Sequence, residues 1–179
     1  VGHDADGSGN GAIVVGYEAE GTDTSAVAIG WRASATGLYS TAIGSNASNT
    51  ATGVALGRDT IATTGVSIGF NAETGSNSFA LGSNTTATFA GSMAFGNGSS
   101  TTATNQIVFG GGSVPITSAF LGKGVTHATP TDVTYNATGG DGTDIAGANI
   151  ILAGGKGTGS GAGGEVVFST SDAGSTGTT

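Results

Sequence analysis

Ala26-Val27-Ala28-Ile29-Gly30 is the clearest copy of a five-residue motif that returns throughout residues 1–110. Each copy closes on glycine and has apolar residues at its second and fourth places, with Ala or Ser between them in most copies. The closing residues are Gly2, Gly16, Gly30, Gly44, Gly57, Gly69, Gly82, Gly96 and Gly110. The steps between them are 14, 14, 14, 13, 12, 13, 14 and 14 residues. Such a short, sustained step predicts a stacked solenoid.

The motif itself predicts a β-strand. Its apolar residues stand two apart, as Val27 and Ile29 do, and alternate side chains of a strand leave opposite faces. One face is therefore bulky and aliphatic, while the other carries Ala or Ser. Two interpretations of the Ala face are open, namely packing inside the coil and an interface with identical chains. We favour the interface.

A second small residue follows each closing glycine by three places, and it predicts a shorter return strand. These residues are Ala5, Ala19, Ala33, Ala47, Thr60, Ala72, Thr85 and Ser99. A turn of the solenoid then contains two strands and two corners, and glycine supplies corners that need positive φ or have no room for a side chain. We expect the steps of 12 and 13 residues to differ from the others only within a corner.

A coil of two short strands per turn encloses a narrow core, and such a thin stack is only marginally stable alone in water. Its end turns also expose strand edges. Packing several chains around an axis would cover one face of each. We therefore expect an obligate homo-oligomer, with a homotrimer as the preferred state.

The motif, exemplified by Ser40-Thr41-Ala42-Ile43-Gly44, resembles the head repeats of trimeric autotransporter adhesins over residues 1 to about 110. The resemblance implies a left-handed parallel β-roll with three chains side by side. Similar repeats occur in tail fibres of bacterial viruses. Autotransporter heads are normally followed by a neck motif and a coiled-coil stalk, and neither follows Gly110 here.

Three domains are expected: an all-β roll at 1–112, a connector at 113–131 and a Gly-rich β fibre module at 132–179. The connector holds Pro115 and Pro130. The last module contains three expected strands, at 133–138, 149–153 and 165–170, separated by glycine-rich corners. The passage 139–164 resembles tail-fibre proteins of bacterial viruses, so we also expect this module to be trimeric.

Composition excludes several classes of function. The 179 residues include 36 Gly but no Gly-X-Y period, which excludes collagen, and no Cys, which excludes disulfides and thiolate metal sites. The net charge is −8, and four Lys and Arg residues cannot form a phosphate-binding face, so nucleic acid is not expected as a partner. The sequence contains no apolar run of membrane length, so no membrane insertion is expected in this part.

Aromatic residues beside the repeat glycines are the candidate receptor-binding residues. Tyr17, Trp31 and Phe70 each follow a closing glycine, Arg32 follows Trp31, and Tyr39 lies in a corner. Equivalent places in neighbouring turns stack, so Tyr17 and Trp31 should be adjacent. An exposed aromatic pair beside Arg32 could bind sugar rings or a protein receptor of a cell envelope. The simpler interpretation, which we prefer, is that these rings cover the flank of the roll.

No catalytic, cofactor-binding or metal-binding residues are expected. Asp4-x-Asp6-x-Ser8-Gly9 matches half of a calcium loop, but Val15 stands where its closing acid should be. Glu18, Glu20 and Asp23 could form a glycosidase-like pair but are better interpreted as a charged corner. The run 154–158 lacks the full phosphate-loop pattern, and His3 and His127 lack metal-ligand or triad spacing.

The hypotheses for function follow from these features. The first is a structural segment of an extracellular trimeric fibre, preferably a viral tail fibre that presents a receptor-binding surface, and not an enzyme. The alternative is the head of a bacterial trimeric autotransporter adhesin on the cell surface. The remaining hypotheses are a fibre-borne polysaccharide depolymerase and, more distantly, an ice-binding protein.

Overall fold

The computed structural model of the chain describes residues 1–112, 114–121, 128–129 and 131–169. The chain divides into two compact units, Val1–Ala119 and Phe120–Thr179. All regular structure in the described residues is β-strand and lies in the first unit. Lys123, His127, Pro130 and the residues from 170 onward lie outside the described part.

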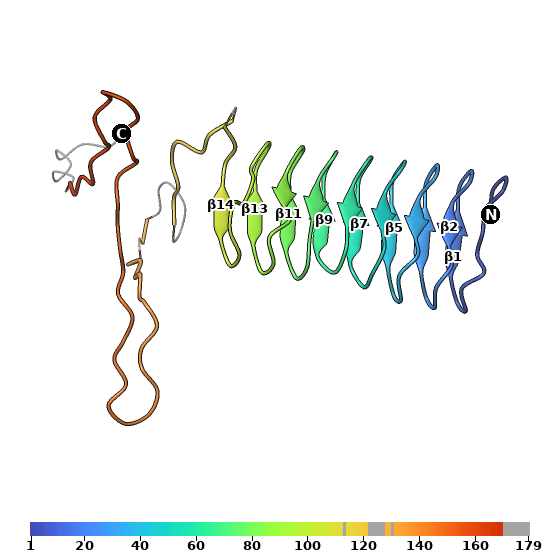
Figure 1. Cartoon of the computed structure of the whole chain (residues 1–179), viewed down its shortest axis with the longest axis horizontal. Helices are drawn as coiled ribbons and strands as arrows, with labels where there is room; N and C mark the ends of the chain where they lie inside the picture. Colours follow the sequence, from blue (N-terminus) through green and yellow to red (C-terminus); the bar gives the residue numbers. More distant parts are fainter. Residues whose placement is uncertain (113, 122–127, 130, 170–179) are drawn as a thin grey trace. The chain divides into compact units, whose positions relative to one another are not determined.

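The first unit is a parallel β-roll with two sheets (Figure 1). One sheet contains eight strands of three residues, hereafter the long sheet: β1 (Ile13–Val15), β3 (Val27–Ile29), β5 (Thr41–Ile43), β7 (Val54–Leu56), β9 (Val66–Ile68), β11 (Phe79–Leu81), β13 (Met93–Phe95) and β14 (Ile107–Phe109). The other contains six strands of two residues, hereafter the short sheet: β2 (Glu20–Gly21), β4 (Ser34–Ala35), β6 (Ser48–Asn49), β8 (Ile61–Ala62), β10 (Glu73–Thr74) and β12 (Thr86–Ala87).

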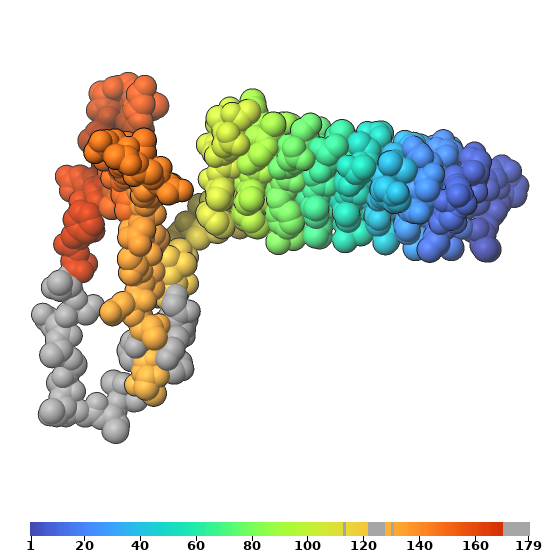
Figure 2. All heavy atoms as spheres, turned by 90° about the horizontal axis from the view of Figure 1, so that it is seen from below, coloured from blue at the N-terminus to red at the C-terminus, as the bar shows by residue number. Residues whose placement is uncertain are grey.

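Most turns of the roll contribute one strand to each sheet, although no short strand lies between β13 and β14, and equivalent residues of successive turns pair in register. In the long sheet Val27 pairs with Thr41 and Ala28 with Ala42, and both sheets are parallel throughout. Figure 2 shows the turns stacked in contact along the roll. The solenoid, the two strands per turn and the all-β fold are therefore as the repeat predicts.

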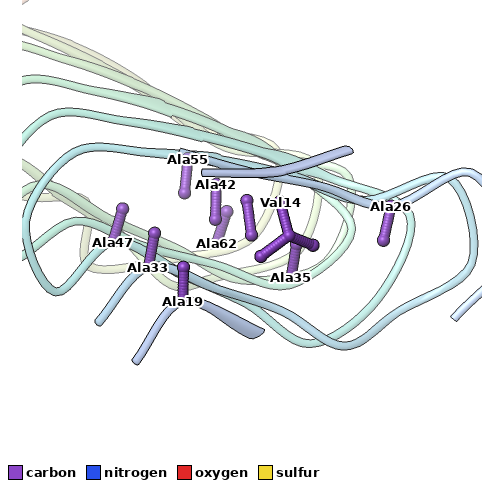
Figure 3. Packing of buried hydrophobic residues seen from close by; sticks show 10 residues of the cluster. Val14, Ala19, Ala26, Ala33, Ala35, Ala42, Ala47, Ala55 and Ala62 are labelled. Carbon is purple, nitrogen blue, oxygen red and sulfur yellow. The ribbon is translucent and has the colours of Figure 1, made fainter. Parts of the chain in front are cut away.

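The core of the roll is built from alanine. Figure 3 shows Ala42 and Ala55 pointing inward from one side of the coil and Ala33 and Ala47 pointing inward from the other. All four are fully buried within a single chain, as is Ala28. The favoured interpretation of the Ala face as an interface between chains is therefore wrong. The two sheets lie so close that methyl groups fill the space between them, and the bulky residues must point outward.

Several hydroxyl groups replace alanine in this core. The Thr60 hydroxyl donates to the carbonyl of Gly69 at 2.8 Å, and Thr85 donates likewise to Gly96 at 2.9 Å. These bonds link one turn to the next. Ser67, by contrast, is fully buried in the middle of β9, and its hydroxyl has no hydrogen-bond partner. Its burial therefore carries a desolvation cost that alanine would not.

The first corner of each turn joins a long strand to a short strand, and it requires glycine. Gly44 has a φ of +137°, and a Cβ placed there would lie 2.2 Å from the carbonyl oxygen of Gly57 in the next turn. Two places later the chain is left-handed in residues such as Asn46 and Asn84, with φ values of 56° and 53°. Glycine is needed here for both its backbone angle and its missing side chain.

The second corner, which leads from a short strand to the next long strand, takes up all the variation in repeat length. From Gly44 the short strand starts four residues later at Ser48, and from Gly57 it starts four residues later at Ile61. The next long strands start at Val54 and Val66, ten and nine residues after those glycines. The steps of 13 and 12 residues therefore leave both sheets in register, as expected.

The second unit contains no strand among its described residues. The segments expected as strands are extended in Figure 1, but their residues are almost all exposed. Backbone hydrogen bonds across this unit include Ala148 to Thr138 and Gly164 to Gly155, both 2.8 Å, which is too few for a ladder. The predicted strands are thus absent from the single chain, because each would need a neighbouring strand to satisfy its backbone groups. The proposed boundaries at 112/113 and 131/132 stay a prediction.

Candidate functional site

The outer side of the long sheet is a continuous apolar surface, hereafter the apolar face. The first and third residues of every long strand point to it, and all are apolar except Thr41. Ile13, Ile43, Leu81 and Ile107 on this face are 55, 38, 42 and 57% exposed. Exposed apolar surface extending over eight strands is characteristic of an interaction site.

The outer side of the short sheet, hereafter the polar face, differs in chemistry. Glu20, Ser34, Ser48 and Thr86 lie on it, and Ile61 is its one bulky apolar residue among the short strands. Ser34 also donates a hydrogen bond to Glu20 in the preceding turn at 3.3 Å. This face is suited to contact with water.

Aromatic rings gather at one end of the apolar face. Phe95 stacks on Phe109 with ring centres 5.2 Å apart and planes inclined by 15°, and it contacts Phe79 at 5.5 Å. Phe109 is 66% exposed in the single chain. The bulky end of the face therefore lies at the last turns of the roll.

A cluster of aromatic and charged side chains lies along the first corners of the N-terminal turns, hereafter the aromatic edge: His3, Tyr17, Glu18, Trp31 and Arg32. The Tyr17 ring stacks on His3, with centres 5.4 Å apart and planes 14° from parallel. The Arg32 guanidinium lies 4.7 Å from the centre of the Trp31 ring, and its Nε donates to Glu18 at 2.5 Å. Tyr17 and Trp31 occupy successive turns, since the amide of Arg32 donates to the Tyr17 carbonyl at 2.8 Å.

Charges on the aromatic edge are held in fixed partnerships. The hydrogen bond from Arg32 lowers the pKa of Glu18, and a second hydrogen bond from the Tyr17 side chain lowers it further. The same bond to the Glu18 carboxylate raises the pKa of Tyr17. Glu18 is thus a carboxylate at neutral pH, held between the phenol and the guanidinium, which fixes the orientation of both.

The other two predicted receptor-binding residues lie elsewhere. Phe70 lies at the place equivalent to Trp31, in the first corner three turns later. The Arg58 guanidinium lies 4.2 Å from the centre of the Phe70 ring. Tyr39 is 63% exposed and lies in a second corner, on the opposite edge of the roll. The predicted set therefore falls into the aromatic edge, a separate Arg58–Phe70 pair, and an isolated Tyr39. The pairing of each arginine with a ring was not expected from the sequence.

The remaining chemical motifs have local partners. Asp6 accepts the amide of Ser8 at 2.9 Å, and Asp23 accepts that of Thr24 at 2.7 Å. Within the described ranges, no group of three or more His, Cys, Asp or Glu side chains could hold a metal ion. Among the carboxylates suggested as a glycosidase pair, Glu18 accepts a hydrogen bond from Arg32 and Glu20 accepts one from Ser34. Lys156 lies in an extended, exposed segment of the second unit.

A small apolar cavity lies within the second unit. It has a volume of about 510 Å³ and is lined by Tyr135, Ile150, Leu152 and Phe168, which belong to the three extended segments. Across the part of the chain that the structure describes, we find no helix able to cross a membrane.

Comparison with known proteins connects the roll to one family of repeats. Residues 22–47 and 74–105 match the family model of the YadA head domain repeat, in two copies. Among solved structures, the collagen-binding domain of the Yersinia adhesin YadA is similar, with 27% sequence identity, a TM-score of 0.49, and coverage of 79% of this chain and 81% of that chain. No curated protein sequence matches the chain.

The family-model match supports the resemblance to autotransporter heads and gives no support to a viral tail fibre, so our first hypothesis on origin gives way to the alternative. The matched residues run from β3 to β5 and from the last residue of β10 to β13, and both stretches follow the same pattern of inward alanine, mostly apolar outward residues and closing glycine in the long strands. In two stretches the roll is therefore similar to YadA head domain repeats.

Proposed function

We propose that this chain forms the head of a homotrimeric adhesin on a bacterial cell surface, in which three rolls pack through their apolar faces. The observation that carries the proposal is the apolar face itself. A role in adhesion and mechanical reach, without catalysis, agrees with the repeat family. The extracellular location follows from the same family.

Burial of the apolar face against another chain would stabilise the roll, because the roll has little other apolar area to bury. Its interior consists mainly of alanine, serine and threonine, so each turn gains little from the hydrophobic effect. Covering one Ile or Leu side chain contributes roughly 1.5–3 kcal/mol when burial is complete. Two outward residues on each of eight strands, all apolar except Thr41, offer apolar surface that a partner can cover.

A second copy of the chain fits this face better than an unrelated protein. The face repeats with the same period as the roll, so a matching partner must have the same spacing, and another roll has it by construction. Cyclic packing also gives every copy the same environment, which is the usual rule in homo-oligomers. Three copies satisfy this rule and agree with the trimers that the resemblance implies.

Trimerisation also gives the adhesive mechanism. Three identical chains present each surface site three times, and linked weak sites bind more tightly than one alone, often by factors of about 100 or more. The polar faces and the corner edges are the surfaces left for a receptor in this arrangement.

The decisive experiment combines a mass measurement with two substitutions in the same turn. Sedimentation of the full chain should give three times its 16.9 kDa mass. Ile43→Asp places a charge on the apolar face, and we expect it to abolish the trimer. Ser48→Asp places the same charge on the polar face a few residues later, and it should leave the trimer intact.

Adhesion is tested with the same proteins. Beads coated with the trimer should adhere to host cells or extracellular matrix, and beads coated with Ile43→Asp should not. A parent chain that sediments as a monomer, or an Ile43→Asp chain that still sediments as a trimer, would contradict the proposal.

A further inference from the structure

We infer that the aromatic edge is a binding site for a neutral saccharide, whose ring packs on Tyr17 and Trp31 while its hydroxyl groups bond to Glu18 and Arg32. This inference deepens the proposed function, because it assigns a ligand class to the adhesin head. It requires only that the edge stay accessible in the trimer.

Exposure and rigidity of the rings are the first argument. Trp31 is 46% exposed and Tyr17 is 43% exposed, although both are attached to corners locked by glycine. The stack of Tyr17 on His3 and the contact of Arg32 with Trp31 restrain both rings, and each ring stays partly exposed. Rigid, half-exposed rings lose little conformational entropy when a ligand packs on them.

Hydrogen-bonding groups beside the rings are the second argument. A sugar hydroxyl both donates and accepts, so it needs an acceptor and a donor close together. Glu18 provides a carboxylate beside Trp31 and Tyr17, and the bond from the Arg32 Nε leaves the terminal nitrogens of that guanidinium as donors. The ion pair keeps both groups oriented before a ligand arrives.

Charge determines that the saccharide is neutral. Arg32 is balanced by Glu18, and Asp4 adds another negative charge at 2.9 Å from His3. The roll as a whole carries two basic residues, Arg32 and Arg58, against seven acidic ones: Asp4, Asp6, Glu18, Glu20, Asp23, Asp59 and Glu73. The edge therefore offers no excess positive charge to attract a sialylated or sulfated glycan.

The site is local to the N-terminal turns. The turn after Trp31 carries Ser45 at the equivalent place, and the later pair of Arg58 and Phe70 has one ring only. Arg58 there pairs with its neighbour Asp59 at 3.3 Å. No other described first corner combines two aromatic rings with a carboxylate and a guanidinium.

Trp31 is the only tryptophan of the chain, so its fluorescence reports this site alone. The experiment titrates the full chain, in a fraction whose mass has been measured by sedimentation, with maltose, lactose and chitobiose as neutral probes and with sialyllactose as an acidic probe. We expect at least one neutral disaccharide to change the Trp31 emission saturably at millimolar concentration, and sialyllactose to bind more weakly.

Two variants locate the site. Tyr17→Ala removes one ring while Trp31 still reports, and it should weaken binding about tenfold, the effect of losing one ring contact. Glu18→Gln keeps the shape but removes the charged acceptor, and it should weaken binding as well. Tyr39→Ala removes an even more exposed ring on the opposite edge, outside the aromatic edge, and should leave the titration unchanged.

Four results would overturn the inference. The first is a trimer in which no probe changes the emission, the second is preference for sialyllactose, and the third is equal loss on Tyr39→Ala and Tyr17→Ala. The fourth is a trimer whose Trp31 emission is typical of a buried indole and shifts to that of an exposed indole when the trimer dissociates. Such a shift would place the aromatic edge inside the trimer interface. Saccharide binding by a monomeric chain would support the site while contradicting the trimer.

Discussion

The two sheets of the roll follow one backbone plan but present different outer faces. Both are parallel, both are paired in register, and both place alanine inward. Outside, the long sheet presents two apolar residues on every strand but β5, such as Val54 and Leu56, whereas the short sheet presents mostly polar residues such as Ser48 and Glu73. Under the proposed assembly, folding and assembly are encoded separately in this repeat, by the inward and the outward residues.

The largest expected effect separates these two roles within one strand. Ala28→Arg would bury an unpaired charge in the core, at a cost of several kcal/mol that is comparable with the stability of a whole domain. We expect the chain to lose its β-sheet circular dichroism. Val27→Arg, one residue earlier, lies on the apolar face and should prevent assembly.

A folded, assembled Ala28→Arg chain would contradict the placement of alanine inside the roll. A Val27→Arg chain that still assembles would contradict the separate role of the apolar face. Circular dichroism and sedimentation on both variants distinguish the two outcomes.

A smaller effect is expected at the corner that joins the two sheets. Gly44→Ala would bring a Cβ to 2.2 Å from the Gly57 carbonyl oxygen at a φ of +137°. We expect a loss of about 3 kcal/mol in the free energy of unfolding, measured by denaturant titration.

Gly98→Ala is the matched control for this corner. Gly98 also has positive φ, +68°, but a Cβ there would meet no atom within 4 Å. Only backbone strain remains, so about 1 kcal/mol should be lost. Equal losses in the two variants would mean that the close approach of successive turns does not limit this corner.

A stabilising change is expected inside the long sheet. Ser67 stands where most long strands have alanine, and its buried hydroxyl has no hydrogen-bond partner. Ser67→Ala should therefore raise the free energy of unfolding by about 1 kcal/mol, without changing the mass in solution. Thr85→Ala offers the contrast, because the Thr85 hydroxyl bonds to Gly96 and its loss should destabilise the roll.

The smallest expected effect is a pH dependence of stability that arises from Glu18 on the aromatic edge. Arg32 and Tyr17 hold the pKa of Glu18 below its ordinary value of 4.5, so the folded state binds this proton less readily than the unfolded chain. The stabilisation from this pair is present above pH 4.5 and is lost as the pH falls through the lower, folded-state pKa.

An NMR titration of the Glu18 carboxyl group tests this pH dependence. In Arg32→Gln the pKa of Glu18 should rise toward 4.5, since the largest cause of its shift is removed. An unchanged pKa in that variant would show that Arg32 does not interact with Glu18 in solution.

Much of the roll could be predicted from the sequence because its constraints are periodic. The glycines fix the first corner, and the small residue three places later fixes the return strand, as Gly44 and Ala47 illustrate. The inward side could not be chosen with the same certainty. A pattern of period two is consistent with either face pointing inward. The usual rule that bulky residues are buried does not apply here, because the space between the two sheets is wide enough only for methyl groups.

The candidate site was only partly predictable. Tyr17, Trp31 and Arg32 were expected together because they occupy neighbouring turns, but the partnership of Arg32 with Glu18 depends on side-chain orientation at a left-handed corner. Tyr39 was included because it is aromatic and lies in a corner, although its corner belongs to the other edge. In the second unit the alternating apolar residues were detected, but a strand needs a partner that a single chain does not provide.

The second corner has a practical consequence. Differences of one or two residues in this corner leave both sheets in register, so the corner tolerates insertions and deletions. Peptides grafted there would emerge at successive levels separated by one strand spacing, roughly 4.8 Å. The roll could thus serve as a scaffold that displays epitopes at regular intervals. Natural variants could change the antigenic surface at the second corners while both sheets stay constant.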